Sequence, residues 1–206
     1  MINRYELVNR HNPVLTKADK SSPLSVGNGN FAFTADITGM QTLYEEYQTT
    51  LPLCTMAQWA WHTKPVSEKR YSYALSDVEM TEYPYEGRTV QYAVKKKNGN
   101  EEAYDWVRQN PHKLNLARIS FAYQGNPITE DQITDIYQEL KLYEGIMDSR
   151  FQISGESCHV ITASDCDTDT VSFQVKSMAL EKGLSVFISF PYGNHGISAS
   201  DWDMKS

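Results

Sequence analysis

Apolar and polar residues alternate along much of this 206-residue chain, and the clearest alternation follows a glycine-rich segment. Every second position of residues 31–37 is apolar, namely Phe31, Phe33, Ala35 and Ile37. This period of two predicts a strand with one buried face. The preceding Gly27, Asn28 and Gly29 tolerate positive φ, so they predict a tight turn that leads into the strand.

The same period recurs in the last third of the chain. It covers residues 151–153, 158–162, 171–175 and 184–190. The breaks between these segments are Gly155, the acidic run 165–169 and Lys182-Gly183. Short strands at this spacing are typical of antiparallel meanders. The fold class that we expect is therefore all-β, an antiparallel β-sandwich with one or two short helices.

The middle of the chain predicts two more strands and one helix. Residues 90–94 alternate and end at the turn dipeptide Asn98-Gly99, and residues 115–123 alternate again. Between these strands, Asn100 is a suitable N-cap for a short helix that ends before Asn110-Pro111.

Residues 133–143 fit two different periods. A helical stripe would contain Ile133, Ile136, Tyr137, Leu140 and Tyr143. Thr129 and Gln132 would supply a capping box for that helix. Gln138, Leu140 and Leu142 would instead line one face of a strand. The local pattern favours the helix.

Three other segments are less regular. Residues 5–15 predict an edge or irregular strand that is interrupted by Pro13. Residues 43–47 predict an extension into a second strand after the glycine-rich turn and its strand, and residues 71–85 predict irregular chain or short edge strands.

Composition sets the domain count and excludes one class of partner. Apolar residues make up 40% of the chain and aromatic residues 12%, which is ample for one core over residues 1–200. The formal net charge of −7 argues against a nucleic-acid partner, because such a protein needs a positive footprint for phosphates. The basic run 95–97 leads into the Asn98-Gly99 turn and is interpreted as a solvated hairpin end.

The cysteines and the chain start predict a soluble protein with free thiols. Cys54, Cys158 and Cys166 cannot all pair and show no C-x-x-C spacing, so we expect free, mostly buried thiols and no metal or other cofactor. The first residues lack the apolar core of a signal peptide, and no segment approaches the ~20 apolar residues of a membrane span. No membrane partner is expected, and periplasmic and cytoplasmic locations both stay open.

The strongest candidate for ligand contact is an aromatic segment that contains Trp59, Trp61 and His62. Aromatic faces stack on the C–H surfaces of sugars, while polar neighbours bind the hydroxyl groups. The alternative is that both tryptophans are core residues. Asn28 in the glycine-rich turn is a further candidate for sugar contact, beside a purely conformational role.

A second polar cluster surrounds Pro111 and consists of Arg108, Asn110, His112 and Arg118. Its members are expected to brace a loop, and Arg108 and His112 are the two that we retain as substrate-binding candidates. No pair of carboxylates stands out as an acid and base for glycosidic bond cleavage, so no catalytic residue is assigned.

Two other patterns, an acidic run and a Cys-His pair, resemble functional sites but are better interpreted as structural. Asp165, Asp167 and Asp169 have the spacing that opens a calcium loop, but Thr170 and Lys176 stand where that loop needs glycine and glutamate. A solvated connection between strands is the better interpretation. Cys158 and His159 are neighbours on a predicted strand, so they should point to opposite faces and not act as a pair.

The segment Leu24-Ser-Val-Gly-Asn-Gly-Asn-Phe-Ala-Phe resembles the "GNG" strand of the N-terminal β-sandwich in glycoside hydrolase family 65 enzymes and their relatives, which include family 95 fucosidases. A later segment from Leu140 to Val160 is similar to the paired strands of the same domain, where an "L-x-L-x-x-G" pattern precedes an alternating strand. This resemblance favours a strand over residues 136–143, against the local pattern. Only Gly27, Asn28 and Gly29 match position by position.

The resemblance implies a galactose mutarotase-like supersandwich that precedes a catalytic (α/α)6 barrel. In these families a glutamate of the barrel is the general acid, with water or phosphate as the attacking species. Residues 201–206 would then be the start of a linker to such a barrel. The implied partners are that C-terminal barrel of the same polypeptide and an oligosaccharide or glycoside substrate.

Three functions are compatible with these observations. The leading one is the non-catalytic N-terminal β-sandwich of an inverting glycoside hydrolase or phosphorylase, which supports the barrel and contacts the substrate. The alternatives are a free-standing carbohydrate-binding module and a mutarotase-like epimerase, for which His62, His112 or His159 would supply the acid. Open sandwich edges also leave a homodimer as an option.

Overall fold

A computed structural model describes residues 2–64, 66, 72–94, 99–194 and 200–203 of the chain. Within the range where the sequence predicts one domain, the chain forms two compact units. Unit 1 combines Met1–Ala60 with Asn115–Ser206, and unit 2 is the insertion Trp61–Leu114. In the described residues, none of the helices is both long and apolar enough to cross a membrane.

The larger sheet of unit 1 has five antiparallel strands in the order β1-β11-β12-β13-β14. Its strands are β1 (Val14–Leu15), β11 (Ile133–Lys141), β12 (Ile146–Ile153), β13 (Glu156–Ser164) and β14 (Val171–Ser177). The predicted meander is confirmed for β12 to β14. β11 confirms the strand that the resemblance favours and shows that the helix preferred from the local pattern is wrong. The capping box of Thr129 and Gln132 belongs to a short 3-10 turn, η2 (Glu130–Gln132).

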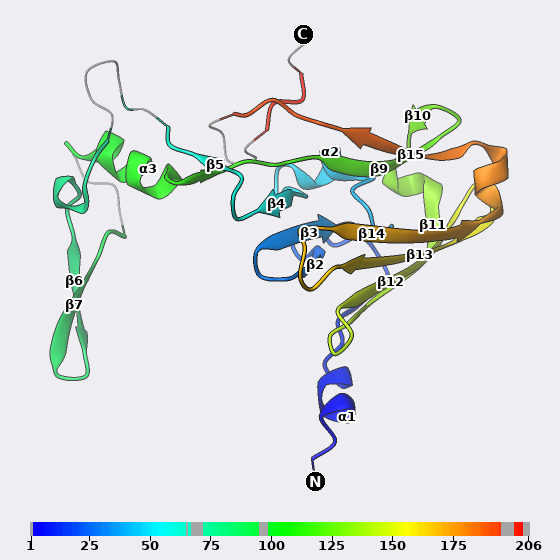
Figure 1. The fold of residues 1–206 in the computed structure, drawn as a ribbon, viewed down its shortest axis with the longest axis horizontal. Coiled ribbons are helices and arrows are strands. Elements are labelled where there is room, and N and C mark those ends of the chain that lie inside the picture. The colour runs from blue at the N-terminus through cyan, green and yellow to red at the C-terminus, as the bar shows by residue number, and fades with distance from the viewer. Residues whose placement is uncertain (1, 65, 67–71, 95–98, 195–199, 204–206) are drawn as a thin grey trace. The chain divides into compact units, whose positions relative to one another are not determined.

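The opposite layer of unit 1 contains two three-stranded sheets, β2-β3-β4 and β10-β9-β15. Their strands are β2 (Leu24–Gly27), β3 (Phe31–Ala35), β4 (Thr55–Ala57), β9 (Arg118–Tyr123), β10 (Asn126–Pro127) and β15 (Leu184–Ser189). The two sheets are linked where the N–H of Leu116 donates to the carbonyl of Thr55 at 2.8 Å. In Figure 1, β9 and β15 run side by side, away from β11 to β14.

β15 does not extend the meander. It pairs along its whole length with β9, from Leu184 opposite Tyr123 to Ser189 opposite Arg118. The 3-10 helix η3 (Met178–Lys182) and Gly183, at φ 105°, redirect the chain from β14 to the other layer. Period two predicts a strand but not its neighbour, which explains this difference.

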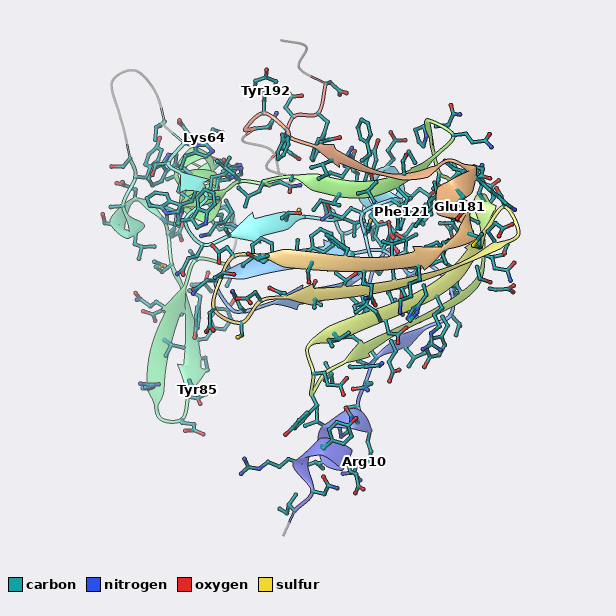
Figure 2. All side chains as sticks on the ribbon, turned by 45° about the vertical axis from the view of Figure 1, so that its right-hand side comes forward. Arg10, Lys64, Tyr85, Phe121, Glu181 and Tyr192 are labelled. Atoms are coloured by element: carbon teal, nitrogen blue, oxygen red, sulfur yellow. The ribbon has the colours of Figure 1, made fainter. Side chains whose placement is uncertain are left out.

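The core of unit 1 lies between these layers, and Figure 2 shows side chains of both layers filling the space around Phe121. Its buried apolar residues come from nearly every strand of both layers and include Ile37, Met40, Leu43, Tyr47, Phe121, Ile133, Phe151, Ile153, Val160 and Leu184. The all-β, antiparallel sandwich class is confirmed, with three short α-helices among the described residues instead of one or two. Cys158 is buried in this core while Cys166 is exposed, so the thiols are free but not mostly buried.

Helices replace two of the strands expected in unit 1. The start of the expected edge strand over residues 5–15 is α1 (Arg4–Asn9), which the Asn3 side chain caps by accepting a hydrogen bond from Glu6 N at 3.3 Å. The end of that segment does form an edge strand, β1. The expected strand over residues 43–47 is α2 (Tyr44–Tyr47), where only Tyr47 is fully buried. Both segments have apolar residues whose spacing fits either element over so short a length, which makes the period ambiguous.

Unit 2 contains a hairpin, a helix and a short strand pair. Its elements are β5 (Trp61–His62), η1 (Leu75–Asp77), β6 (Thr81–Tyr85), β7 (Arg88–Tyr92), α3 (Glu101–Gln109) and β8 (His112–Lys113). The predicted strand and helix are confirmed as β7 and α3, and a small core forms around Val78, Ala103 and Tyr104. The basic run 95–97 and Asn98 lie outside the described residues.

A buried segment, residues 36–43, connects the two layers of unit 1. The sequence predicts Asp36 on the polar face of a strand, but β3 ends at Ala35 and Asp36 is only 1% exposed. Its Oδ1 accepts hydrogen bonds from the N–H and the hydroxyl of Thr38 at 2.8 and 2.6 Å, and its Oδ2 accepts from Leu43 N at 2.6 Å. The carboxylate thereby satisfies donors of a segment that has no regular structure.

The buried segment is tied to strands of both layers. Gln41 donates its N–H to the carbonyl of Ile119 at 2.8 Å and accepts from Ile119 N through Oε1 at 3.2 Å. On the other side, the Thr162 hydroxyl donates to the Gly39 carbonyl at 2.7 Å, and Gln138 Nε2 donates to the Asp36 carbonyl at 2.7 Å. Residues 36–43 therefore hold β9 of one layer against β11 and β13 of the other.

We expect Gly39→Ala to destabilise unit 1 strongly. A Cβ at residue 39 would lie 2.9 Å from Ser149 Oγ and 3.0 Å from Thr162 Oγ1, and the backbone there has φ +75°. Gly29→Ala is a matched control, because Gly29 also has positive φ (+93°) but has no atom within 4 Å of an added Cβ. Urea unfolding should show a loss of ~1 kcal/mol for the control and ~2–4 kcal/mol for Gly39→Ala. Equal losses would contradict the close packing of this segment.

The stability of unit 1 should depend on pH through Asp36. Burial raises the pKa of Asp36 from 3.8 to about 6 in the folded protein, so the folded state binds a proton more tightly than the unfolded state. The free energy of unfolding of the parent protein, relative to Asp36→Asn, should therefore increase by up to ~3 kcal/mol as pH falls from 7.5 toward 4. Urea unfolding of both proteins across this range measures the difference, and parallel pH profiles would contradict the assignment.

Candidate functional site

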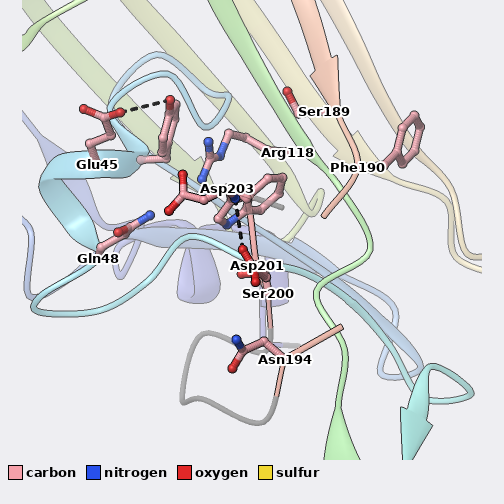
Figure 3. Close-up of a pocket in the computed structure, with 11 residues that line it drawn as sticks. Glu45, Gln48, Arg118, Ser189, Phe190, Asn194, Ser200, Asp201 and Asp203 are labelled. Atoms are coloured by element: carbon pink, nitrogen blue, oxygen red, sulfur yellow. Dashed lines mark hydrogen bonds between the residues drawn. The ribbon is translucent and has the colours of Figure 1, made fainter. Parts of the chain in front are cut away.

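A polar pocket of about 800 Å³ opens in unit 1 where α2, the first residue of β9, the end of β15 and the C-terminal segment meet. Figure 3 shows the side chains that line it. They are Tyr44, Glu45, Gln48, Arg118, Ser189, Phe190, Asn194, Ser200, Asp201, Trp202 and Asp203. We call this the Arg118 pocket.

Two aromatic rings enclose the guanidinium group of Arg118. Its Cζ lies 3.0 Å from the ring centroid of Tyr44 and 3.8 Å from that of Trp202, and the residue is 8% exposed. Burial lowers the pKa of Arg118 to about 10, which still leaves it charged at neutral pH. In the described residues, no carboxylate lies within ion-pair distance of this cation. The Tyr44 side chain and the more distant charge of Glu45 oppose the effect of burial on its pKa, and the two ring faces add cation–π contacts.

Short-range hydrogen bonds hold the walls of the pocket in place. Tyr192 and Asp201 form a two-way backbone bridge, with N···O distances of 2.9 and 2.8 Å, which brings the C-terminal segment back to the end of β15. Asp201 Oδ1 accepts from Asp203 N at 3.0 Å, and the hydroxyl of Tyr44 donates to Glu45 Oε1 at 3.2 Å. The segment that carries Trp202 is thus fixed by its neighbours on both sides.

The lining of the Arg118 pocket combines apolar rings with hydrogen-bonding groups. Tyr44, Phe190 and Trp202 supply the rings, and Glu45, Asp201 and Asp203 supply carboxylates. Ligand sites of this kind use flat apolar surfaces for affinity and a few polar groups for orientation. Among the described lining residues, three carboxylates stand against one covered guanidinium, which favours a neutral or cationic ligand.

The sequence indicated this pocket only in part. Arg118 was assigned to the polar cluster around Pro111, whereas the structure stacks it on Tyr44 and Trp202. Tyr44 was expected in a strand and Trp202 in a linker, so neither was a candidate. An arginine at the start of an alternating strand, on the face opposite the core residues, is the one local signal that could have identified the site.

The six candidate residues from the sequence divide between the two units. Asn28 and Trp59 belong to unit 1, and Trp61, His62, Arg108 and His112 belong to unit 2. None of the six lines the Arg118 pocket.

Asn28 forms the corner of the predicted tight turn, which the structure confirms. Its Oδ1 accepts from Asn30 N at 2.9 Å and Phe31 N at 2.8 Å. Its Nδ2 donates to the carbonyls of Asp165 and Thr168 at 3.1 and 2.9 Å, on the connection between β13 and β14. The side-chain amide thus donates two hydrogen bonds and accepts two, which is all that an amide group can form. The conformational role of Asn28 is therefore better supported than sugar contact.

Trp59 lies at the same corner of unit 1. Its Nε1 donates to Asp169 Oδ2 at 2.9 Å, and the side chain is 66% exposed, so it is not a core residue. The connection 165–169 that both residues contact is exposed and internally bonded, with Thr168 N donating to Asp165 Oδ1 at 2.8 Å. In the described part of the chain, no group of three or more His, Cys, Asp or Glu residues is arranged to hold a metal ion.

Unit 2 brings two of the sequence candidates together. His62 on β5 lies directly opposite His112 on β8, with ring centroids 5.3 Å apart in an edge-to-face arrangement. Trp61 is the neighbour of His62 on the strand, so its side chain points to the other face, where it is 51% exposed. Trp61 is therefore not a core residue either.

The cluster around Pro111 partly braces a loop, as expected. Asn110 Oδ1 accepts from Lys64 N at 2.7 Å, and its Nδ2 donates to the Trp106 carbonyl at 2.8 Å. Arg108 lies at the exposed end of α3, where its Nη1 donates to the Tyr104 hydroxyl at 3.4 Å. These contacts are all within unit 2.

Comparison of the chain with protein-family models, with curated proteins and with solved structures finds no match.

We expect Asn28→Ala to reduce the free energy of unfolding by ~2 kcal/mol, because it removes the acceptor for Phe31 N and the donors to the connection 165–169. Asn30→Ala is the matched control, since the exposed Asn30 takes part in the turn only through its backbone. Urea unfolding measures both. A loss of sugar affinity without a loss of stability would instead favour ligand contact by Asn28.

Proposed function

We propose that this chain is a carbohydrate-binding β-sandwich of a carbohydrate-active enzyme, and that the Arg118 pocket binds the sugar. The observation that carries this proposal is the combination of stacked aromatic rings with three carboxylates in one pocket of about 800 Å³. A pyranose offers an apolar C–H face to a ring and hydroxyl groups to carboxylates and amides. The pocket volume is sufficient for a short oligosaccharide.

The role in the larger enzyme is to support catalysis and not to perform it. The enzyme type that we propose, an inverting glycoside hydrolase or phosphorylase, rests on the resemblance of the segment around Gly27, Asn28 and Gly29. An epimerase on the same fold needs a histidine acid next to a glutamate base, and none of the described residues that line the Arg118 pocket is a histidine. Among the described residues, no arrangement favours the epimerase over the binding role.

An exposed apolar strand supports the expected second domain of the polypeptide. β15 is an edge strand in the described residues, and Val186, Phe187 and Ile188 on it are 46%, 60% and 54% exposed. Val186 and Ile188 share one face of the strand and Phe187 points to the other, and exposed apolar side chains at a sheet edge are typical of an interaction surface. A catalytic (α/α)6 barrel of the same polypeptide is the partner that we propose for it.

Isothermal titration of the purified chain with a panel of neutral oligosaccharides tests the sugar site. For the ligand that binds, we expect Trp202→Ala to weaken affinity about tenfold, or ~1.4 kcal/mol, because the stacking surface is lost. Tyr85→Ala, at an exposed tyrosine of the β6–β7 hairpin, is the control and should leave affinity unchanged.

Two further variants locate the site independently. Trp59→Ala and Trp61→Ala remove the exposed rings that the sequence selects. A loss of affinity in either one, with Trp202→Ala unaffected, would contradict the Arg118 pocket while keeping carbohydrate binding. Absence of binding across the whole panel would contradict carbohydrate binding by this chain.

A further inference from the structure

Three basic side chains form a row across the outer face of the five-stranded sheet. Arg150 on β12 lies directly opposite His159 on β13, and His159 lies directly opposite Lys176 on β14. The core-facing residues are their strand neighbours, such as Phe151 and Cys158, so the basic side chains point away from the core. The predicted opposition of Cys158 and His159 across the sheet is thereby confirmed.

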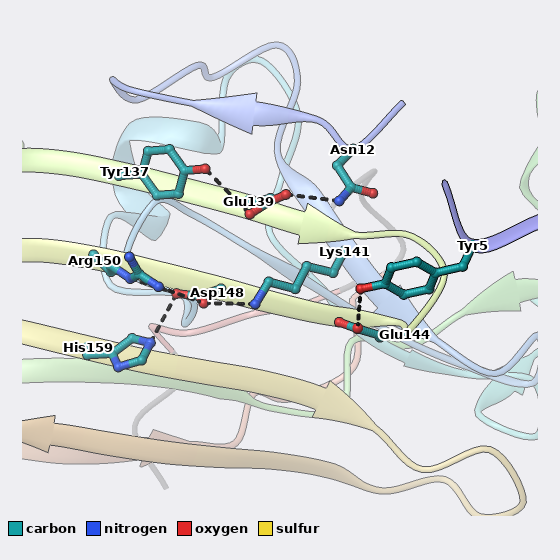
Figure 4. A network of polar contacts seen from close by, with 9 residues as sticks. All are labelled: Tyr5, Asn12, Tyr137, Glu139, Lys141, Glu144, Asp148, Arg150 and His159. Atoms are coloured by element: carbon teal, nitrogen blue, oxygen red, sulfur yellow. Dashed lines mark hydrogen bonds and ion pairs between the residues drawn. The ribbon is translucent and has the colours of Figure 1, made fainter. Parts of the chain in front are cut away.

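Such a row is electrostatically unfavourable unless an anion compensates it. Arg150 and Lys176 are permanent cations on either side of His159, which adds a third charge only when it is protonated. Residues directly opposite on neighbouring strands have Cβ atoms roughly 5 Å apart, where like charges destabilise a sheet. The partial compensation comes from Asp148, which is 3% exposed. Its carboxylate oxygens lie 3.2 Å from Arg150 Nε and 3.0 Å from His159 Nε2, as Figure 4 shows.

Asp148 is not sufficient to neutralise the row. Burial opposes its ionisation, yet hydrogen bonds from Lys141 and Arg150 hold the pKa of Asp148 below its usual value, so it is charged at neutral pH. Lys141 Nζ lies 3.1 Å from Asp148 Oδ2. The single negative charge of Asp148 is therefore shared by two permanent cations, Lys141 and Arg150. Lys176 forms no ion pair with any residue in the described ranges.

A hollow of about 420 Å³ lies over this row. Arg150, His159 and Lys176 line it together with Gln152 and Ser157, whose side chains share the same face of the sheet. Asp135 is the one acidic residue among the lining residues. The hollow therefore presents two cations, Arg150 and Lys176, with the imidazole of His159 between them, beside a neutral amide and a hydroxyl.

We propose that this hollow binds a small oxyanionic group, a phosphate or a sulfate, as a free ion or as an ester on a larger ligand. The guanidinium of Arg150 already donates to Asp148 through Nε and Nη2, both at 3.2 Å. Its remaining N–H groups on Nη1 and Nη2 can donate to such a group, and the ammonium of Lys176 adds a point charge. The site lies on the five-stranded sheet, whereas the negative Arg118 pocket lies at β9 and β15, so the two take ligands of different charge. It does not depend on the proposed function.

Titration with inorganic phosphate and, separately, inorganic sulfate at low ionic strength tests the site by two-dimensional NMR on the intact chain. Amide shifts should change around residues 150, 159 and 176, and Lys176→Gln should weaken the affinity at least fivefold. Lys17→Gln removes one exposed cation elsewhere in unit 1 and is the matched control, with an unchanged affinity. The same titration with glucose 6-phosphate, and with glucose as its control, then shows whether the site also binds a phosphate ester.

Asp135→Asn gives a test in the opposite direction. Asp135 has φ 51°, a conformation that asparagine adopts readily, so the substitution removes a charge without strain. We expect phosphate affinity to increase at least twofold. An absence of shift changes at the row, equal weakening by Lys17→Gln and Lys176→Gln, or no gain in Asp135→Asn would each overturn the proposal.

Discussion

The buried carboxylate of Asp36 is the interaction on which unit 1 depends. Nine consecutive residues, 35–43, are buried, although only Ala35 among them belongs to a strand. A buried segment without regular structure needs partners for its polar backbone groups, and Asp36 supplies an acceptor at both of its ends, to Thr38 and to Leu43. A raised pKa is the consequence of placing that carboxyl group at the centre of the sandwich.

The position of the Arg118 pocket follows from this segment. Gln41 bonds to both backbone groups of Ile119, which is the neighbour of Arg118 on β9. The same segment ends at Leu43, so it also sets the start of α2 and places the ring of Tyr44 on the guanidinium. Residues 36–43 thus orient Tyr44 and Arg118, whereas Trp202, the other ring on the guanidinium, lies on the C-terminal segment.

Period-two patterns predicted most strands of unit 1, because one face of each lies on a single core and the other faces solvent. The pattern did not predict the burial of polar residues that have hydrogen-bond partners inside the protein, nor which strands pair. Asp36 occupies a polar position of the alternation and is buried because its partners come from residues 38–43. β15 alternates like the strands before it, yet its residues pair with β9 residues that lie between 61 (Leu184 and Tyr123) and 71 (Ser189 and Arg118) positions away, and no local pattern specifies a partner at that distance.

The candidate residues were predicted by residue type, which does not determine what a side chain already binds. Asn28 is suited to sugar contact by type, but its amide is fully used within the protein. Arg118, by contrast, was expected to brace a loop, and its cation instead lies between two rings with no carboxylate partner in the described residues. Contacts with ring faces do not consume N–H groups, so the stacked cation keeps donors for acceptors other than the Tyr44 hydroxyl. That difference, more than exposure or residue type, separates a structural polar side chain from one that is available to a ligand.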